Sequence, residues 1–426
     1  MENEELWEKI ENIRLLTHHT NRNKIKIDNK NKKLGAKKGH KGYFFVVPDK
    51  VDKIINIKIK KCPECKKKVG KVNFIKPYFC RDLIISRKSI TVKDIRYLVH
   101  NYYCKKCGRY VYTKPKRMIN QSVYGIGMFV YSTVKRITLF TPYNKISSEI
   151  EQLFSTNISN VAPLKFLNRM AIENQEGYDD VLKKIKKAKV LHSDETRWPI
   201  NGVKWWVWVF TSDREAVYIL NEKRDAKVPT DLLKEFKGVL VCDFYSAYEK
   251  VKCKQQKCLV HVLRDFQKAL KAAPYDDELR IFIQEFLDIF NPIFEKLREK
   301  PLSYELIRSQ KLETRKKIKD LIKKQYLSKT VNTFKKRFKK HLENMIRFMN
   351  NPEKISWNNN KAERDLRPLC VQRKISGTMK TEKDSNAYLL LFSIYQTCEK
   401  RGINFMKFLL SRRKKIPKKA IKSLAK

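Results

Sequence analysis

The chain contains 426 residues, and its 95 Lys and Arg residues against 45 Asp and Glu give a formal net charge of +50. Because like charges repel, an excess of this size indicates a polyanionic partner such as nucleic acid. The length exceeds one ordinary hydrophobic core, so two or three domains are expected, and a hydrophobic fraction of 42% excludes a wholly disordered basic chain.

The first residues, 1–10, are acidic and lack the basic flank and apolar core of a signal peptide. No run of about 18 apolar residues occurs, which is the minimum for a membrane-spanning helix. We therefore expect a cytoplasmic protein, associated with the nucleoid if its partner is DNA, and no membrane contact. In that reducing compartment the ten cysteines are expected to bind metal or to be buried, rather than to form disulfides.

Composition and periodicity divide the chain into seven segments. In chain order these are a basic arm with a Gly-rich linker, a metal-stapled module, a helical connector expected to contact DNA, the first part of an α/β core, a helical insertion, the second part of the core and a basic tail. Their predicted boundaries are 1–47, 48–118, 119–187, 188–274, 275–352, 353–410 and 411–426. The expected fold class is thus an α/β core with helical additions and a small N-terminal module.

Two Cys-x-x-Cys pairs lie in the second segment. Cys62 and Cys65 form the first pair, Cys104 and Cys107 form the second, and Gly108 follows. Two thiolate pairs on tight turns supply four soft ligands, which predicts a tetrahedral Zn²⁺ site in a zinc-ribbon module. The gap between the pairs is longer than in most zinc ribbons, so two unrelated reduced pairs are the alternative.

Three further side chains have the chemistry to be ligands of this metal. Cys80 lies between the two pairs and is expected to be a buried apolar residue rather than a fifth ligand. His40 and His100 could compete for the metal, but a single histidine more often has a structural role. The predicted zinc site therefore uses the four thiolates alone.

The α/β pattern begins near Lys189. β-branched and aromatic residues predict strands at Val190–His192, Trp205–Phe210, Ala216–Leu220 and Gly238–Cys242, with a helix near Thr230–Phe236. Short turns between the first three strands, and a helix before the fourth, indicate an antiparallel meander followed by a parallel strand.

Two aspartates directly follow predicted strands. Asp194 comes after the first strand and Asp243 after the fourth, at the carboxyl edge where α/β proteins place their active sites. An aspartate that caps a turn is the alternative for each. Glu363 lies among basic residues at a predicted helix start, Asn359–Pro368, where a shared metal ion or DNA phosphates best explain a carboxylate.

Several motifs follow one another in a characteristic order along the chain. They are Gly35–Gly42, the double Cys pair, His192–Thr196, Asp243–Tyr248, Cys258–His261, and Asn359–Pro368 with Arg373 and Lys374. This order resembles transposases of the insertion sequence 66 family, from about Gly35 to the end of the chain. Two features depart from the family pattern, because the N-terminal coiled coil is short or missing and glycines are lacking after the first Cys pair.

The resemblance implies a ribonuclease H-like catalytic core with a mixed sheet and a helical insertion. It also implies that Asp194, Asp243 and Glu363 form the DDE set, which holds Mg²⁺ or Mn²⁺ ions for DNA cleavage and strand transfer. Double-stranded DNA at the element ends and target DNA are the expected partners, bound by a homo-oligomer.

Four residues beside the implied site are assigned other roles. Glu195 and Asp365 are expected at the surface or behind the metal ligands. Cys258 and His261 are spaced to share a metal ion, but with only two ligands visible they are expected to anchor the start of the insertion.

Basic residues surround Glu363 and are expected to contact DNA phosphates, with solvated surface charge as the alternative. These residues are Arg364, Arg367, Arg373 and Lys374. Trp205, Trp206 and Trp208 alternate, so one could stack on an unpaired base, although core packing is favoured. The basic tail is expected to tether DNA without sequence preference.

The sequence thus favours a metal-dependent DNA transposase of an insertion sequence over two other functions. One is a zinc-ribbon DNA-binding protein whose inactive core makes it a repressor or scaffold. The other is a structure-specific DNA nuclease. The presence of all three acids argues against an inactive core, and the resemblance argues for strand joining as well as cutting.

Overall fold

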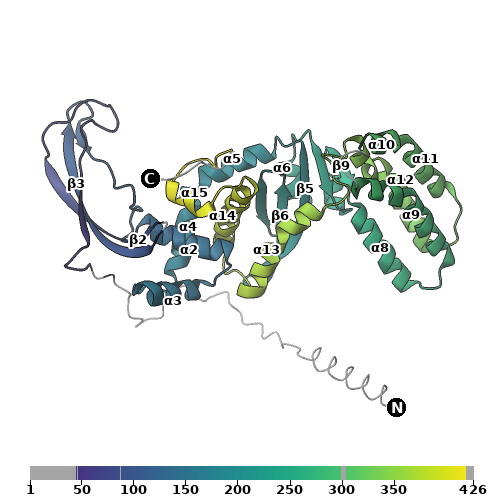
Figure 1. The fold of residues 1–426 in the computed structure, drawn as a ribbon, viewed down its shortest axis with the longest axis horizontal. Helices are drawn as coiled ribbons and strands as arrows, with labels where there is room; N and C mark the ends of the chain where they lie inside the picture. The colour runs from purple at the N-terminus through teal and green to yellow at the C-terminus, as the bar shows by residue number, and fades with distance from the viewer. Residues whose placement is uncertain (1–44, 46, 87, 299–303, 419–426) are drawn as a thin grey trace, which may run out of the picture. The chain divides into compact units, whose positions relative to one another are not determined.

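The computed structural model describes residues 45, 47–86, 88–298 and 304–418 (Figure 1). The predicted N-terminal arm, with its Gly-rich loop and His40, lies almost wholly outside these residues, as does the end of the basic tail. The described chain is a mixed α/β structure with two mixed sheets and many helices. None of the helices within these ranges has the length and apolar character needed to cross a membrane.

The first sheet is built on a long hairpin. Its strands are β1 (Lys53–Ile57), β2 (Phe74–Ile85), β3 (Ile90–Cys104) and β4 (Arg109–Val111). β3 pairs with β2 and β4 in antiparallel fashion and with β1 in parallel. Its apolar cluster is small, formed around Cys80, Ile95, Tyr97 and Val99. A core of this size stabilises little by itself, so a cross-link at the thiol pairs would contribute much of the module's stability.

Four helices follow, α2 (Ile126–Thr138), α3 (Tyr143–Phe154), α4 (Ala162–Glu173) and α5 (Gln175–Ile185). α2 begins against a buried carboxylate, because Asp82 Oδ1 accepts the backbone N–H groups of Gly127 (2.7 Å) and Met128 (3.3 Å). A negative charge at a helix N-terminus is stabilising. Gly127 permits this close approach, since a Cβ there would lie 1.8 Å from the carbonyl oxygen of Leu83. The contact fixes where α2 leaves the first sheet.

The second sheet has the strand order β7-β6-β5-β8-β9. Its strands are β5 (Val190–Ile200), β6 (Val203–Thr211), β7 (Ala216–Asn221), β8 (Val239–Cys242) and β9 (Lys254–Lys257). β5, β6 and β7 form an antiparallel meander, whereas β8 pairs with β5, and β9 with β8, in parallel. The predicted meander and parallel strand are confirmed. The helix expected before β8 is α6 (Lys227–Leu232), which begins and ends earlier than predicted.

β9 was not predicted, because its sequence Lys-Gln-Gln-Lys lacks any apolar residue. Gln255, Gln256 and Lys257 are nevertheless buried. Gln256 Nε2 donates to the carbonyl oxygen of Met345 (3.0 Å), and its Oε1 accepts the N–H of Phe348 (2.7 Å). Buried polar groups are tolerated when they are hydrogen-bonded. The polar strand is therefore stabilised by a distant part of the chain, which hydropathy cannot reveal.

α7 (Ser246–Glu249) lies between β8 and β9, and α8 (Leu259–Ala272) leads from β9 into the helical insertion. The insertion contains α9 (Asp277–Arg298), α10 (Tyr304–Ser309), α11 (Lys311–Lys323), α12 (Lys329–Met345) and the short helix η2 (Arg347–Asn350). Its core is aromatic, with Phe266 of α8 edge-on to Phe286 (5.1 Å between ring centroids) and to Phe334 (4.8 Å). α8 thus contributes to the hydrophobic core of the insertion.

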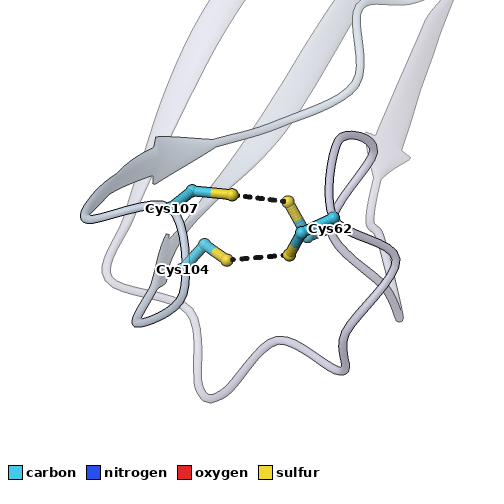
Figure 2. Close-up of side chains that lie close together, drawn as sticks. Cys62, Cys104 and Cys107 are labelled. Atoms are coloured by element: carbon cyan, nitrogen blue, oxygen red, sulfur yellow. Dashed lines mark hydrogen bonds between the residues drawn. The ribbon is translucent and has the colours of Figure 1, made fainter.

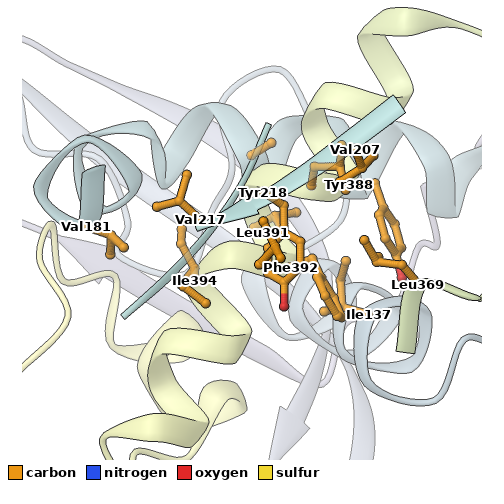
Figure 3. Close-up of a cluster of buried hydrophobic side chains, with 14 of the residues drawn as sticks. Ile137, Val181, Val207, Val217, Tyr218, Leu369, Tyr388, Leu391, Phe392 and Ile394 are labelled. Carbon is orange, nitrogen blue, oxygen red and sulfur yellow. The ribbon is translucent and has the colours of Figure 1, made fainter. Parts of the chain in front are cut away.

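The chain returns to the second sheet through α13 (Asn360–Ser376), α14 (Glu382–Lys400) and α15 (Phe405–Ser411). Figure 3 shows Val217 and Tyr218 of β7 among Leu391 and Phe392 of α14. The backbone N–H of Tyr218 also donates to Ser393 Oγ (3.0 Å), so α14 covers this edge strand. The same hydrophobic cluster includes residues of α2, α4 and α5. The connector helices therefore share a core with the second sheet, and the segment boundaries remain predictions.

Candidate functional site

The two Cys pairs come together at one end of the first sheet (Figure 2). Cys62 and Cys65 lie on the loop after β1, Cys104 is the last residue of β3, and Cys107 lies in the turn between β3 and β4. The Sγ atoms of Cys62 and Cys107 are 3.9 Å apart, those of Cys65 and Cys104 are 3.5 Å apart, and all four lie within 4.8 Å. Thiolates about 2.3 Å from Zn²⁺ in a tetrahedron are separated by about 3.8 Å, so the predicted ligand set fits zinc.

The turns that carry the thiols differ in their backbone strain. Lys66 and Gly108, which follow the two pairs, both adopt a left-handed conformation with φ of 64°. Glycine adopts this conformation freely, whereas a residue with a Cβ adopts it at a cost. In the first turn the backbone N–H of Cys65 lowers the pKa of Cys62 to about 7, which favours the thiolate that a metal needs.

Cys80 and His100 do not join the thiols. Cys80 is fully buried among apolar side chains of the first sheet, and burial raises its pKa to about 12. His100 Nε2 lies 2.9 Å from Asn56 Oδ1, so it is engaged in a hydrogen bond. Both have the structural roles that were predicted for them.

Asp194 and Asp243 are positioned by two neighbouring parallel strands of the second sheet, β5 and β8. Asp243 directly follows β8, as predicted. The prediction that Asp194 follows its strand is wrong, because Asp194 lies inside β5 and pairs with Val209 of β6. β5 continues through polar residues because β6 holds it in register as far as Ile200, while its pairing with β8 ends at His192. The two aspartates therefore lie at the point where β5 stops pairing with β8.

Glu363 lies in the first turn of α13, and Asn359 ties that turn to β5. Asn359 is fully buried, and its Nδ2 donates to the carbonyl oxygen of Ser193 (2.8 Å). Its Oδ1 lies 3.3 Å from Nδ1 of His192. These bonds anchor the start of α13 beside the residue that precedes Asp194, which brings Glu363 toward the two aspartates.

The charges of the acids act on one another at this edge of the sheet. The pKa of Asp194 is raised to about 8, first by burial and then by the negative charges of Glu195, Asp243 and Glu363. Mutual repulsion of this kind disfavours the ionised forms. A divalent cation among the carboxylates would offset it.

The three predicted carboxylates do not meet at one point. Among the described residues, the four thiols are the one group of three or more Cys, His, Asp or Glu side chains whose ligand atoms all lie within 4.8 Å. Glu363 instead faces Arg264, whose Nη1 and Nη2 donate to Oε1 and Oε2, each at 3.1 Å. In this arrangement both oxygens of Glu363 are hydrogen-bonded to Arg264.

Glu195 and Asp365 were predicted to lie either at the surface or behind the metal ligands. The surface position is wrong for both, because both side chains are buried. The side chain of Glu195 is 1% exposed and accepts hydrogen bonds from Arg224 (2.6 Å) and the Tyr248 hydroxyl (2.7 Å). Asp365 is also buried and pairs with Lys400 at 2.8 Å. Because a buried carboxylate is costly without partners, these ion pairs explain why both acids are inside.

Lys257, Tyr248 and Arg264 were missed as residues of the site. Lys257 is fully buried, and its Nζ donates to the carbonyl oxygen of Asp243 (2.8 Å). Its position in the unpredicted polar strand β9 explains the omission. Arg264 comes three residues after His261 on α8, so its place just beyond the Cys258–His261 motif was the signal that could have identified it.

Cys258 and His261 have different surroundings. Cys258 Sγ accepts the backbone N–H of Asn359 (3.2 Å), which joins the start of α8 to that of α13 and agrees with its predicted anchoring role. His261 Nε2 lies 3.9 Å from Glu363 Oε1, so His261 lies beside the acids.

A cationic cavity of about 500 Å³ opens beside β5. Its lining residues are Glu195, Thr196, Arg197, Pro199, Lys204, Trp206 and Arg373. Glu195, the acid in this lining, is already paired with Arg224. The half-exposed Trp206 contacts two arginines, Arg197 and Arg224, whose guanidinium carbons are 5.8 and 5.0 Å from its ring centroid, whereas Trp208 is fully buried. The excess positive charge suits an anion such as a phosphate.

The four predicted phosphate-binding residues do not converge on one place. Arg373 lines the cationic cavity beside β5. Arg364 and Arg367 line a separate groove of about 410 Å³ next to Thr138 of α2. Lys374 is exposed.

A strongly basic chain with acids and a cationic cavity at the edge of a mixed sheet has the features of an α/β protein that processes nucleic acid. The model of the family described as "Transposase IS66 family" matches residues 121–387, more than half of the chain. The chain therefore belongs to the IS66 transposase family, a class of DNA-processing enzymes. The matched range includes Asp194, Asp243 and Glu363 and begins after the four thiols. No curated protein sequence matches the chain.

Proposed function

We propose that this protein is a DDE transposase that cleaves DNA at the ends of its own element and transfers the cut strand to target DNA. Asp194, Asp243 and Glu363 would hold the divalent metal ions. The observation that carries this proposal is the hydrogen bond from Asn359 to Ser193, which anchors the start of α13, and with it Glu363, beside the strand that carries Asp194. The raised pKa of Asp194, to which Asp243 and Glu363 both contribute, supports their proximity.

We also propose that the second sheet is the core of a ribonuclease H-like fold. Its strand order, numbered from β5 as the first strand, is 3-2-1-4-5, with strand 2 antiparallel and strands 4 and 5 parallel to strand 1. Asp194 lies on the central strand and Asp243 at the end of the neighbouring strand. The helical insertion separates Asp243 from Glu363 in sequence, and α13 returns Glu363 to the same edge.

The donor set suits hard divalent cations, since carboxylate oxygens are the ligands that Mg²⁺ and Mn²⁺ prefer. Two such ions, when bound, activate the attacking oxygen and stabilise the leaving oxygen of a phosphodiester. The chain's own residues hold and orient the acids. Asn359 fixes Glu363 relative to β5, and buried Lys257 fixes the backbone of Asp243.

The positively charged residues support DNA as the substrate. Arg197, Lys204 and Arg373 converge on the cavity beside β5, where phosphates next to the reacting one would lie. The thiol cluster is proposed to bind one Zn²⁺ that stabilises the first sheet. A homo-oligomer bound to DNA remains the proposed assembly, because strand transfer joins two element ends to a target.

The proposal is tested by nicking and joining of a duplex that carries the element's end, with Mg²⁺ and then Mn²⁺. Asp194→Asn, Asp243→Asn and Glu363→Gln should each lower the rate by at least about a thousandfold, because several kcal/mol of transition-state stabilisation are lost. Double variants should be little worse than single ones, since the acids act as a unit. DNA binding should persist in all of them.

Asp231→Asn is a matched control, because Asp231 is an exposed acid on α6 of the same sheet domain. It should cut and join at the normal rate. Near-normal joining by Asp243→Asn would contradict the proposed metal site. Cutting without joining by the unmodified protein would favour a nuclease, and neither activity with intact DNA binding would favour a repressor or scaffold.

A further inference from the structure

Both carboxylate oxygens of Glu363 accept hydrogen bonds from the same arginine. Arg264 donates from Nη1 to Oε1 and from Nη2 to Oε2, with both distances 3.1 Å. This bidentate geometry is the strongest form of arginine–carboxylate pair. It satisfies the two oxygens that the proposed metal site would need from Glu363.

The arginine is held opposite Glu363 by the way two helices begin. Leu259 at the start of α8 donates its N–H to the carbonyl oxygen of Trp357 (3.0 Å), and Cys258 Sγ accepts the N–H of Asn359 (3.2 Å). The starts of α8 and α13 are therefore fixed to each other. Arg264 in the second turn of α8 then faces Glu363 in the first turn of α13.

The guanidinium of Arg264 remains accessible. Its side chain is 46% exposed, while that of Glu363 is 19% exposed. Arg224, by comparison, bonds Glu195 and also lies over the ring of Tyr245, 4.2 Å from its centroid. In the described part of the chain, the hydrogen bonds and the ion pair of Arg264 are those to Glu363, so another anion that replaced Glu363 would break no further hydrogen bond of this side chain.

We propose that Arg264 competes with the divalent metal for Glu363, and that a DNA phosphate releases Glu363 by taking over the arginine. This inference rests on the proposed function. A guanidinium and a metal ion that approach the two oxygens from the same side exclude each other, and their positive charges repel. The planar fork of arginine binds phosphate in the same bidentate manner as carboxylate.

The exchange would make Arg264 a positioning residue that couples two ligands. Without DNA, Glu363 stays with Arg264 and the metal site has an incomplete ligand set. With DNA, the phosphate occupies Arg264 and Glu363 turns to the metal. Binding free energies are reciprocal, so DNA and metal should each strengthen the binding of the other by the same factor.

The first experiment measures Mn²⁺ binding to the zinc-loaded, full-length protein by calorimetry, without DNA. Arg264→Gln should bind Mn²⁺ about tenfold more tightly than the unmodified protein, a typical size for coupling between two ligands. Lys268→Gln is the matched control, because it removes the same charge one turn further along α8 and leaves Glu363 untouched. It should change the Mn²⁺ affinity much less.

Glu363→Gln identifies the carboxylate concerned. In the Glu363→Gln background, Arg264→Gln should no longer tighten Mn²⁺ binding. Equal or weaker Mn²⁺ affinity of Arg264→Gln, while Asp194→Asn and Glu363→Gln still weaken it, would overturn the competition but leave the proposed function standing. No effect of Asp194→Asn or Glu363→Gln on Mn²⁺ affinity would instead contradict the proposed function itself.

The second experiment tests the release by DNA. Anisotropy of a labelled duplex carrying the element's end is measured with and without Ca²⁺, which takes similar oxygen ligands. In the unmodified protein Ca²⁺ should tighten DNA binding, and this factor should be smaller in Arg264→Gln. The same factor in both proteins, or none in the unmodified protein, would show that DNA does not act through Arg264.

Discussion

Lys66 is a strained residue in the first thiol turn. Its φ of 64° equals that of Gly108 in the second turn, where glycine has no Cβ to clash. Lys66→Gly should therefore stabilise the thiol module by about 1 kcal/mol, and Gly108→Ala should destabilise it by a similar amount. The measurement is the chelator concentration that removes half of the bound zinc. Unchanged zinc retention in both variants would show that the turns are not held in this conformation.

Asp194 makes the stability of the metal-free protein depend on pH. Its folded-state pKa, about 8, lies above its ordinary value of 3.8, so the folded protein binds the proton more tightly than the unfolded chain does. Its stabilising contribution is present at low pH and is lost as the pH rises toward about 8.

Asp194→Asn removes this dependence, because the amide stays neutral. Without added divalent metal, the difference in melting temperature between Asp194→Asn and the unmodified protein should grow between about pH 5 and about pH 8. Added Mg²⁺ at high pH should stabilise the unmodified protein more than the variant. A difference that is constant with pH would mean that Asp194 titrates normally.

At the scale of elements, the position of Glu363 depends on how α13 begins. Asn359 has no exposed surface and bonds the backbone of β5. Asn359→Ala should lower the free energy of unfolding by about 1–3 kcal/mol, because the carbonyl group of Ser193 loses its partner inside the protein. Denaturant unfolding measures the change. The neighbouring exposed residue supplies the control, since Asn360→Ala should cost far less, and equal losses would contradict the anchoring role.

The elements that could be predicted are those whose burial follows hydropathy. The apolar strands β6, β7 and β8 were expected from β-branched and aromatic residues, and the structure confirms them. β9 could not be expected, because its buried glutamines bond to Met345 and Phe348 far along the chain. β5 was predicted too short for a related reason, since its polar half is held by pairing with β6 rather than by its own hydropathy.

The residues of the candidate site also fall into those that a local sequence pattern predicts and those that depend on contacts between distant parts of the chain. The four thiols were predicted because Cys-x-x-Cys spacing is a local signal, and the structure brings them together. The contact of Arg264 with Glu363 joins residues 99 positions apart, so no local pattern could indicate it. The assignment of Asp194, Asp243 and Glu363 as metal ligands stays a prediction.

At the scale of the whole molecule, two large hydrophobic clusters meet at the second sheet. The aromatic core of the helical insertion includes Val241 of β8, while the other cluster joins the sheet to α2, α4, α5 and α14. The thiol cluster lies outside both. The net charge of +50 is distributed over all these parts, so affinity for DNA will not by itself identify the reacting site.

The most direct test of the central claim is to locate the divalent metal. Crystals of the protein with a duplex carrying the element's end, grown with Mn²⁺, would reveal the ions by their anomalous scattering. We predict two ions about 3.5–4 Å apart, bound by Asp194, Asp243 and Glu363, with Arg264 turned from Glu363 to a phosphate. Ions bound elsewhere, with these three carboxylates free of metal, would contradict the account.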